Sequence, residues 1–277
     1  MCPYIIIANE FYLPTYGLCF GLGFAITLTL TCLIAKKEGN AWQQVLYCNF
    51  YALIGIGIGA KLMAVVSKIP GFIRGWDNFV YLWNNDFWGL MEYAFGGLVF
   101  YGGLLGAIFG YWVYSKQFKI HINFILDNTV AYFPLLHAFG RLGCLLAGCC
   151  YGMEYYGPFA MQFPENELDE TLNDVPRFPT QLTEIVFNLI LFTVLFILRK
   201  KRVLMPKALL GLYLICYAVM RFLLEFVRGD TIRGSAWMFT TSQWVSIILL
   251  PVGILLIWFN RKSRLKSKQE NLKEDAE

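Results

Sequence analysis

The stretch His137-Ala-Phe-Gly-Arg-Leu-Gly-Cys-Leu-Leu-Ala-Gly-Cys-Cys-Tyr-Gly152 places Arg141 within an apolar segment that, together with the residues before it, is long enough to cross a bilayer. A second arginine, Arg221, lies in a similar apolar segment. A guanidinium stays charged at every relevant pH, so burying one in hydrocarbon costs about 3 kcal/mol or more. Two such residues predict an anionic ligand held at membrane depth, and phospholipid is the most abundant candidate. The alternative is a structural ion pair, for example between Arg221 and Glu225 one helical turn away.

The composition is that of an all-α polytopic membrane protein. Of the 277 residues, 57% are hydrophobic, and the mean hydropathy is +0.52. Only 15% are charged, against roughly 25% in soluble domains. We expect residues 1–277 to form a single integral-membrane domain. The N-terminus has no basic residues before its short apolar run, so it lacks the pattern of a cleavable signal peptide.

Apolar windows of about 20 residues predict the membrane-spanning helices. The windows lie near residues 13–35, 44–66, 96–115, 124–148, 181–198, 208–227 and 238–259, which makes about seven helices. Lysine and arginine follow the first, third, fifth and seventh windows, whereas acidic residues gather in the other connections. The positive-inside rule therefore predicts an N-terminus outside and a C-terminus in the cytoplasm.

Three segments are expected to lie outside the bilayer core. Residues 67–95 are rich in tryptophan and tyrosine, which indicates an external arm at the lipid–water interface. Residues 150–179 are polar and acidic, and we expect this external loop to cap an outward-facing site. Residues 260–277 form a basic cytoplasmic tail. Closely spaced glycines predict tight helix packing, although Gly102 and Gly103 could instead admit a lipid headgroup.

Four polar side chains share one face of the sixth predicted helix. Tyr217, Arg221, Glu225 and Arg228 are spaced i, i+4, i+8 and i+11. This helix and the one that contains Arg141 both run outward, so the two arginines are expected to converge in the outer half of the bilayer. Two guanidinium forks match the charge and the oxygens of a phosphodiester.

The fifth predicted helix begins with a polar stretch, Arg177-Phe-Pro-Thr-Gln-Leu-Thr-Glu184. Proline suits a first helical turn. We expect Gln181 and Glu184 to point into the same outer cavity as the arginines. The alternative is that Thr180 and Glu184 only cap the start of the helix.

Several sequence blocks occur in order along nearly the whole chain: Thr15-Tyr-Gly-Leu18, Gly59-Ala-Lys-Leu62, Phe100-Tyr-Gly-Gly-Leu-Leu-Gly106, Asp127 with Gly140-Arg-Leu-Gly143, Arg177-Phe-Pro-Thr-Gln-Leu182, Tyr217-x3-Arg221-x3-Glu225-x2-Arg228 and Ser242-Gln243. This series resembles the prolipoprotein diacylglyceryl transferases of bacterial inner membranes. That family moves the diacylglyceryl group of phosphatidylglycerol to the thiol of a lipobox cysteine in a lipoprotein precursor. The product is a thioether, and glycerol phosphate leaves.

The resemblance implies a site, partners and a location. Arg141 and Arg221 would hold the phosphate and stabilise the charge that develops on the leaving group. The substrate-binding residues would be Tyr16, Gly102, Gly103, Gln181, Glu184, Tyr217, Glu225 and Arg228. The partners would be phosphatidylglycerol, lipoprotein precursors and the lipid bilayer, in the bacterial cytoplasmic (inner) membrane. We expect no cofactor and no nucleic acid.

The chain departs from the family pattern at the residue that handles the proton. The family's motif histidine is Tyr101 here, and His137, one turn before Arg141, is an alternative base. His137 could equally be a hydrogen-bonded structural group. These changes leave two other functions open: a relative that uses the same lipid with another acceptor, and a non-catalytic lipid-binding or transport protein.

Cysteines occupy positions where the family has polar residues. Cys144 and Cys149, with Ala147, stand where the signature has asparagine and glutamate, and Cys150 follows. Their spacing lacks a paired CxxC frame, so we predict no metal site. Packing as small apolar side chains is the commonest explanation, and a thiol redox role stays open.

Overall fold

The computed structural model describes residues 4–8, 11–75, 80, 83, 85, 86, 88, 89, 99–163, 175–229, 235, 236 and 239–274. Side chains are described for residues 14–260 of these ranges, without 72, 100, 101, 235 and 236. Helices dominate, and the only strands in these ranges form two short two-stranded ladders. The predicted all-α membrane fold class is confirmed.

The helices are α1 (Thr15–Lys37), α2 (Trp42–Arg74), α5 (Phe100–Gln117), α6 (Ile122–Thr129), α7 (Phe133–Ala147), α8 (Thr180–Lys200), α9 (Pro206–Leu224) and α10 (Thr241–Glu274), with 3-10 turns η1 (Val130–Tyr132) and η3 (Glu225–Val227). Strands β1 (Tyr4–Ala8) and β2 (Phe11–Pro14) pair antiparallel, as do β3 (Ser235–Ala236) and β4 (Phe239–Thr240). The chain divides into two compact units, taken separately below: a large unit of Met1–Thr31 and Leu126–Glu277, and a small unit of Cys32–Ile125. A single domain over residues 1–277 stays a prediction.

The protein is a multi-pass membrane protein. Among the described residues, six segments are long and apolar enough to cross a membrane: Thr15–Lys37, Trp42–Gly71, Ile122–Ala147, Thr180–Lys200, Pro206–Val227 and Thr241–Asn260. They match six of the predicted windows, and the window near 96–115 overlaps the 18-residue helix α5. The count of seven crossings and the N-outside orientation stay predictions.

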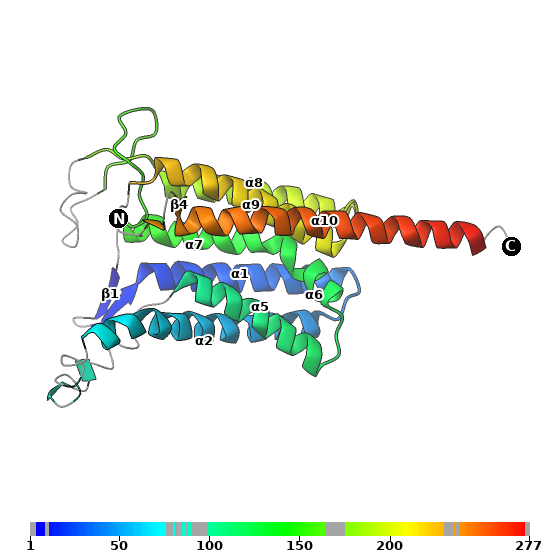
Figure 1. Ribbon diagram of the computed structural model, residues 1–277, viewed down its shortest axis with the longest axis horizontal. Helices are drawn as coiled ribbons and strands as arrows, with labels where there is room; N and C mark the ends of the chain where they lie inside the picture. Colours follow the sequence, from blue (N-terminus) through cyan, green and yellow to red (C-terminus); the bar gives the residue numbers. More distant parts are fainter. Residues whose placement is uncertain are drawn as a thin grey trace. The chain divides into compact units, whose positions relative to one another are not determined.

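In the small unit, α2 and α5 lie side by side (Figure 1) because glycines remove the side chains between them. A Cβ at Gly55 would meet the carbonyl oxygen of Gly106, and one at Gly102 would meet the carbonyl oxygen of Gly59. The predicted tight packing is therefore confirmed for these helices. On α2, Ile54 is 60% exposed and belongs to an apolar stripe at four-residue spacing, as expected for a lipid-facing surface.

In the large unit, α7 packs on α8 and α9 packs on α10, and Figure 1 shows the four helices running alongside one another. The end of α7 lies beside the start of α8, where Thr180 donates a hydrogen bond to the carbonyl of Cys150. The end of α9 lies beside the start of α10, where Arg221 donates a hydrogen bond to Ser242. Residues 152 and 228, which follow α7 and α9, pair in a β-bridge. These helix ends therefore meet at one end of the bundle.

The predicted fourth span is interrupted. Helix α6 stops at Thr129, the buried turn η1 follows, and α7 starts at Phe133. Pro134 lies in the first turn of α7. Proline has no N–H, and its ring clashes with the carbonyl four residues earlier, so a continuous helix through Val130 is disfavoured. Hydropathy alone did not reveal this break.

The three predicted segments outside the bilayer are only partly described. In the arm, α2 continues to Arg74, and Trp83 and Trp88 are 52% and 80% exposed. Trp76 lies outside the described residues. In the external loop, residues 164–174 lie outside the described residues. In the tail, α10 continues to Glu274, and side chains are not described beyond residue 260.

Candidate active site

Glu184 is the centre of a buried polar cluster in the large unit. Its side chain is 1% exposed and projects from the first turns of α8. Arg141 Nε on α7 lies 2.6 Å from Oε2 of Glu184, and Arg221 Nη1 on α9 lies 3.8 Å from Oε1. The two arginines, 80 positions apart in the sequence, therefore converge on one carboxylate, as the helix directions predicted.

Arg221 also binds a second carboxylate. Its Nη2 lies 2.9 Å from Oε2 of Glu225 and donates a hydrogen bond of 2.8 Å to Oγ of Ser242. The structural ion pair with Glu225 is therefore present, but it engages only one of the two amino groups. Nη1 is buried and makes no hydrogen bond to any described residue.

Arg141 meets Glu184 through Nε. Within the described part of the chain, its two terminal amino groups donate no hydrogen bond. The Arg141 side chain is 14% exposed, whereas that of Glu184 is 1% exposed. Because a guanidinium is a planar fork of N–H donors, the terminal donors of Arg141 remain available to an anion.

Two carboxylates accompany the arginines of the cluster. Glu184 lies beside Arg141 and Arg221, and Glu225 lies beside Arg221. Arg228 also interacts electrostatically with Arg221. Because a charge in apolar surroundings is costly unless it is compensated, these ion pairs are needed to keep the guanidinium groups buried.

His137 and Tyr217 border the same carboxylate. Nε2 of His137 lies 3.9 Å from Oε2 of Glu184, and the rings of His137 and Tyr217 lie 5.4 Å apart, centroid to centroid. At 3.9 Å the histidine is near the carboxylate but not hydrogen-bonded to it. A role for His137 as a base stays a prediction.

A cap lies over the ends of α7, α8 and α9. It consists of residues 151–163, 175–179 and 227–229, joined by bridges between Gly152 and Arg228 and between Met161 and Arg177. The guanidinium carbon of Arg177 lies 4.7 Å above the ring of Tyr151, in a cation–π contact. The described residues of the predicted external loop thus lie over the helix ends that carry the polar cluster.

The first residues of α8 bind the chain that follows α7. Gln181 Nε2 donates a hydrogen bond of 2.7 Å to the carbonyl of Cys149, and Thr180 Oγ1 donates one of 2.6 Å to the carbonyl of Cys150. No side chain caps the start of α8, where Pro179 is the N-cap residue. The capping alternative for Thr180 and Glu184 is therefore wrong. A substrate contact of Gln181 stays a prediction.

The remaining predicted site residues are distributed over both units. Tyr16, in the first turn of α1, lies against α7: a Cβ at Gly143 would come within 3.0 Å of Cδ2 of Tyr16. Gly102 and Gly103 face α2 in the small unit. The Tyr101 side chain lies outside the described residues. The substrate-binding roles of these residues stay predictions.

A buried polar residue next to Glu184 on α8 was missed. Asn188 is 0% exposed, and its amide donates a hydrogen bond of 2.7 Å to the carbonyl of Glu184, one turn earlier on α8. The signal was present in the sequence, because Gln181, Glu184 and Asn188 recur at helical spacing on an apolar helix. Ser242, which binds Arg221, was noted only as part of a motif.

A second ionic cluster lies toward the other end of α8. Arg202 Nη1 donates a hydrogen bond of 2.7 Å to Oδ2 of Asp127, and Nη2 of Arg199 lies 3.8 Å from the same oxygen. Arg199 is 2% exposed. In the sequence analysis, Arg199 and Arg202 served only to predict the orientation. In the structure, both also bind Asp127 and so connect α6 to the end of α8.

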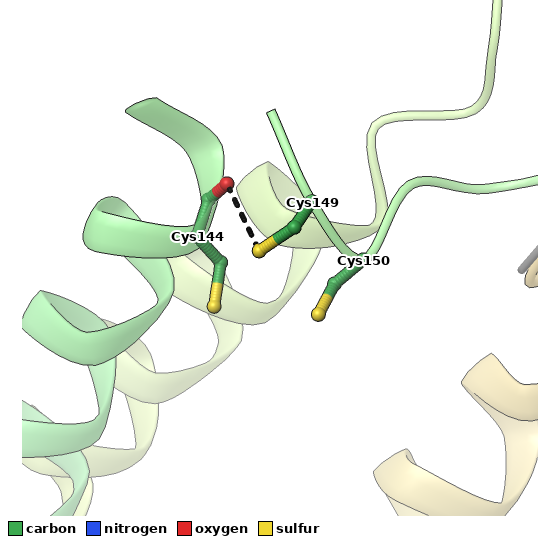
Figure 2. A group of neighbouring side chains, drawn as sticks. All are labelled: Cys144, Cys149 and Cys150. Carbon is green, nitrogen blue, oxygen red and sulfur yellow. Dashed lines mark hydrogen bonds between the residues drawn. The ribbon is translucent and has the colours of Figure 1, made fainter. Parts of the chain in front are cut away.

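Three cysteines meet beside the start of α8. Figure 2 shows Cys144 on α7 and Cys149 and Cys150 on the segment after it, and the three sulfur atoms lie within 4.8 Å of one another. Sγ of Cys149 contacts the carbonyl of Cys144 at 3.7 Å. Hydrogen bonding with the thiols of Cys144 and Cys150 raises the pKa of the Cys149 thiol.

The chain is similar over nearly its whole length to proteins of known activity. Residues 3–259 match the family model described as prolipoprotein diacylglyceryl transferase. The chain is 30% identical over 257 residues to phosphatidylglycerol–prolipoprotein diacylglyceryl transferase 2 of Clostridium perfringens, covering 92% of this chain and 93% of that protein. It is 29% identical over 247 residues to the Clostridium tetani protein with the same activity in its name, covering 89% and 92% of the two chains. A Salmonella arizonae protein so named is 29% identical, with 94% of each chain covered.

Proposed function

Because this chain belongs to the prolipoprotein diacylglyceryl transferase family, we propose that Arg141 and Arg221 hold the phosphate of phosphatidylglycerol during the transfer. The protein is a transferase that moves diacylglyceryl from phosphatidylglycerol to a prolipoprotein. In the proposed step, the thiol of the lipobox cysteine attacks the glyceryl carbon and a C–S bond forms. The C–O bond to the phosphate breaks, and glycerol phosphate leaves with the electron pair.

The arrangement of donors around Glu184 supports this proposal most strongly. Glu184 forms an ion pair with Nε of Arg141 and lies near Nη1 of Arg221, so its carboxylate orients both guanidinium groups. The terminal amino groups of Arg141 and the Nη1 of Arg221 then remain to donate to phosphate oxygens. Arginine forks bind phosphate in a bidentate manner, and they stabilise charge best where they are held before the reaction.

The charge of the cluster fits the substrate. A phosphodiester carries one negative charge, which the guanidinium groups of Arg141 and Arg221 can bind. When the C–O bond breaks, the phosphate gains a further negative charge, and the two arginines lie where that charge develops. Stabilisation of the leaving group is worth most in a site that excludes water, and the burial of Glu184 and Arg221 provides such surroundings.

The thiol proton must be removed, since the thiolate is the nucleophile. We assign this step to His137, which borders Glu184 and Tyr217, with Tyr101 as the alternative. The lipobox cysteine as acceptor, the bilayer as the source of the lipid, and the bacterial cytoplasmic membrane as the location complete the proposal.

The experiment uses purified protein in detergent with phosphatidylglycerol and a lipobox peptide. The peptide should gain the mass of one diacylglyceryl unit while glycerol phosphate is released. The Arg141→Lys variant keeps the charge but lacks the guanidinium fork, so the rate should fall by about 100-fold or more. Arg202→Lys, at an exposed position on Asp127, is the matched control and should leave the rate unchanged.

Other outcomes separate the alternatives. Glycerol phosphate released without any change in peptide mass would indicate another acceptor. Protein that binds the lipid but gives neither signal would be a lipid-binding protein without this chemistry. A normal rate for Arg141→Lys would contradict the assigned role of the guanidinium.

A further inference from the structure

We propose that Cys144, Cys149 and Cys150 form a binding site for one thiophilic d10 metal ion, of the Zn²⁺ or Cu⁺ type. The proposed reaction does not use these three residues. Their sulfur atoms lie within 4.8 Å of one another (Figure 2). The sequence spacing did not predict this closeness.

The end of α7 brings the sulfurs together. The helix stops at Ala147, and Gly148 takes a left-handed conformation with φ of 70°. The amide of Cys149 then donates a hydrogen bond to the carbonyl of Cys144 at 3.1 Å. Because the chain reverses here, Cys149 lies beside the last turn of the helix. Cys149 is therefore close to Cys144 although five positions separate them in the sequence.

Hydrogen bonds from α8 hold the backbone of Cys149 and Cys150. Cys150 has a φ of 66°, a left-handed conformation that costs a non-glycine residue about 1 kcal/mol or more. The carbonyls of Cys149 and Cys150 accept hydrogen bonds from Gln181 and Thr180, which are 1% and 0% exposed. The neighbouring helix therefore keeps both thiols in place, as a preformed site requires.

The distances suit metal–thiolate bonds. With a metal–sulfur bond of about 2.3 Å, the sulfurs of a tetrahedral or trigonal site stand about 4 Å apart. The observed upper limit of 4.8 Å requires the thiols to close by less than about 1 Å, which rotation about the Cα–Cβ bonds supplies. Three M–S bonds then form, and the thiol protons pass to solvent.

The donor set selects a soft ion. Thiolates favour Cu⁺ and Zn²⁺, and hard ions such as Mg²⁺ prefer oxygen. Among the described residues, no histidine or carboxylate joins the three sulfurs. Cu⁺ is satisfied by three thiolates, and Zn²⁺ with three protein ligands keeps an open position. Cys149 is exposed and gives the ion a path to the site.

Charge also favours the bound state. Arg141, one turn before Cys144 on α7, interacts electrostatically with Cys144 and Cys150. A complex of three thiolates with a mono- or divalent cation is negatively charged, and this guanidinium offsets part of that charge.

The test titrates the reduced full-length protein in detergent with Zn²⁺ and, separately, with Cu⁺, each in competition with a chromophoric chelator. At least one of the two ions should bind with one equivalent per chain. Alkylation followed by mass mapping should then show protection of Cys144, Cys149 and Cys150 among the eight cysteines of the chain.

Single variants show whether the three thiols act together. Cys144→Ser, Cys149→Ser and Cys150→Ser should each weaken binding by about tenfold or more, whereas Cys216→Ser should not. Unchanged thermal midpoints would show that the variants are folded. Absence of binding by both ions, protection of other cysteines, or equal binding by all variants would overturn the proposal. Each of these results is independent of the transferase assay.

Discussion

Glu184 joins two arginines that hydropathy places in different helices. Its carboxylate lies 2.6 Å from Arg141 Nε and 3.8 Å from Arg221 Nη1, and it is buried. A buried ion pair often contributes little net stability, because desolvation offsets the attraction. Removing one partner of such a pair is strongly destabilising, because it leaves an uncompensated charge in poorly solvated surroundings.

The Glu184→Gln variant tests this role. It keeps the shape of the side chain but leaves Arg141 and Arg221 without their shared carboxylate, so we expect the protein to lose about 3 kcal/mol or more of stability. The thermal unfolding midpoint in detergent should fall. Transferase turnover should fall as well, because the guanidinium groups are no longer oriented.

Glu154→Gln is the matched control, since Glu154 is exposed on the cap. It should change neither the midpoint nor the rate. If Glu184→Gln behaved in the same way, Glu184 could not be the group that holds the arginines.

At the scale of elements, glycines determine how closely helices pack. Gly55 and Gly57 lie on the same helix, α2, but only Gly55 faces the backbone of α5. In lipid, helices are held together by close packing more than by hydrophobic burial. The two positions are therefore a matched pair for measuring the α2–α5 contact.

We expect Gly55→Ala to lower the thermal midpoint, because the new methyl group would overlap the carbonyl oxygen of Gly106. Gly57→Ala has open space and should leave the midpoint unchanged or raise it, since alanine favours a helix by about 1 kcal/mol over glycine. Differential scanning fluorimetry of both variants provides the measurement. Equal midpoints would show that α2 and α5 do not pack in this way.

At the scale of the whole molecule, charge asymmetry predicts the orientation. Lysine and arginine are concentrated in alternate connections and in the tail, which the positive-inside rule assigns to the cytoplasm. The predicted orientation depends on no tertiary contact, because it follows from which connections are basic and from an odd number of crossings.

Reporter fusions to the C-terminus of the full chain test the orientation. A fluorescent protein that matures only in the cytoplasm should be bright, and a phosphatase that is active only outside should be silent. An N-terminal epitope should be removed by protease added to spheroplasts. An active C-terminal phosphatase would contradict the predicted seven-crossing, N-outside topology.

The sequence by itself determined the membrane class, six of the spans and the convergence of Arg141 with Arg221. These follow from hydropathy and helical spacing, which are local properties summed over a window of residues. Helix direction then places Arg141 and Arg221 at similar depth. Asn188 could have been found in the same way, since it continues the polar face of Gln181 and Glu184.

Only the tertiary structure decided which side chains meet. That Glu184 is shared by two arginines depends on how α7, α8 and α9 pack, and no local pattern encodes that packing. The break at Pro134 depends on a clash with the preceding turn, which an apolar window does not register. The three cysteines meet because α7 ends at Gly148, and a continuous helix would have carried Cys149 onward from Cys144. Contacts between distant residues and the points where helices stop are thus decided by packing and backbone geometry.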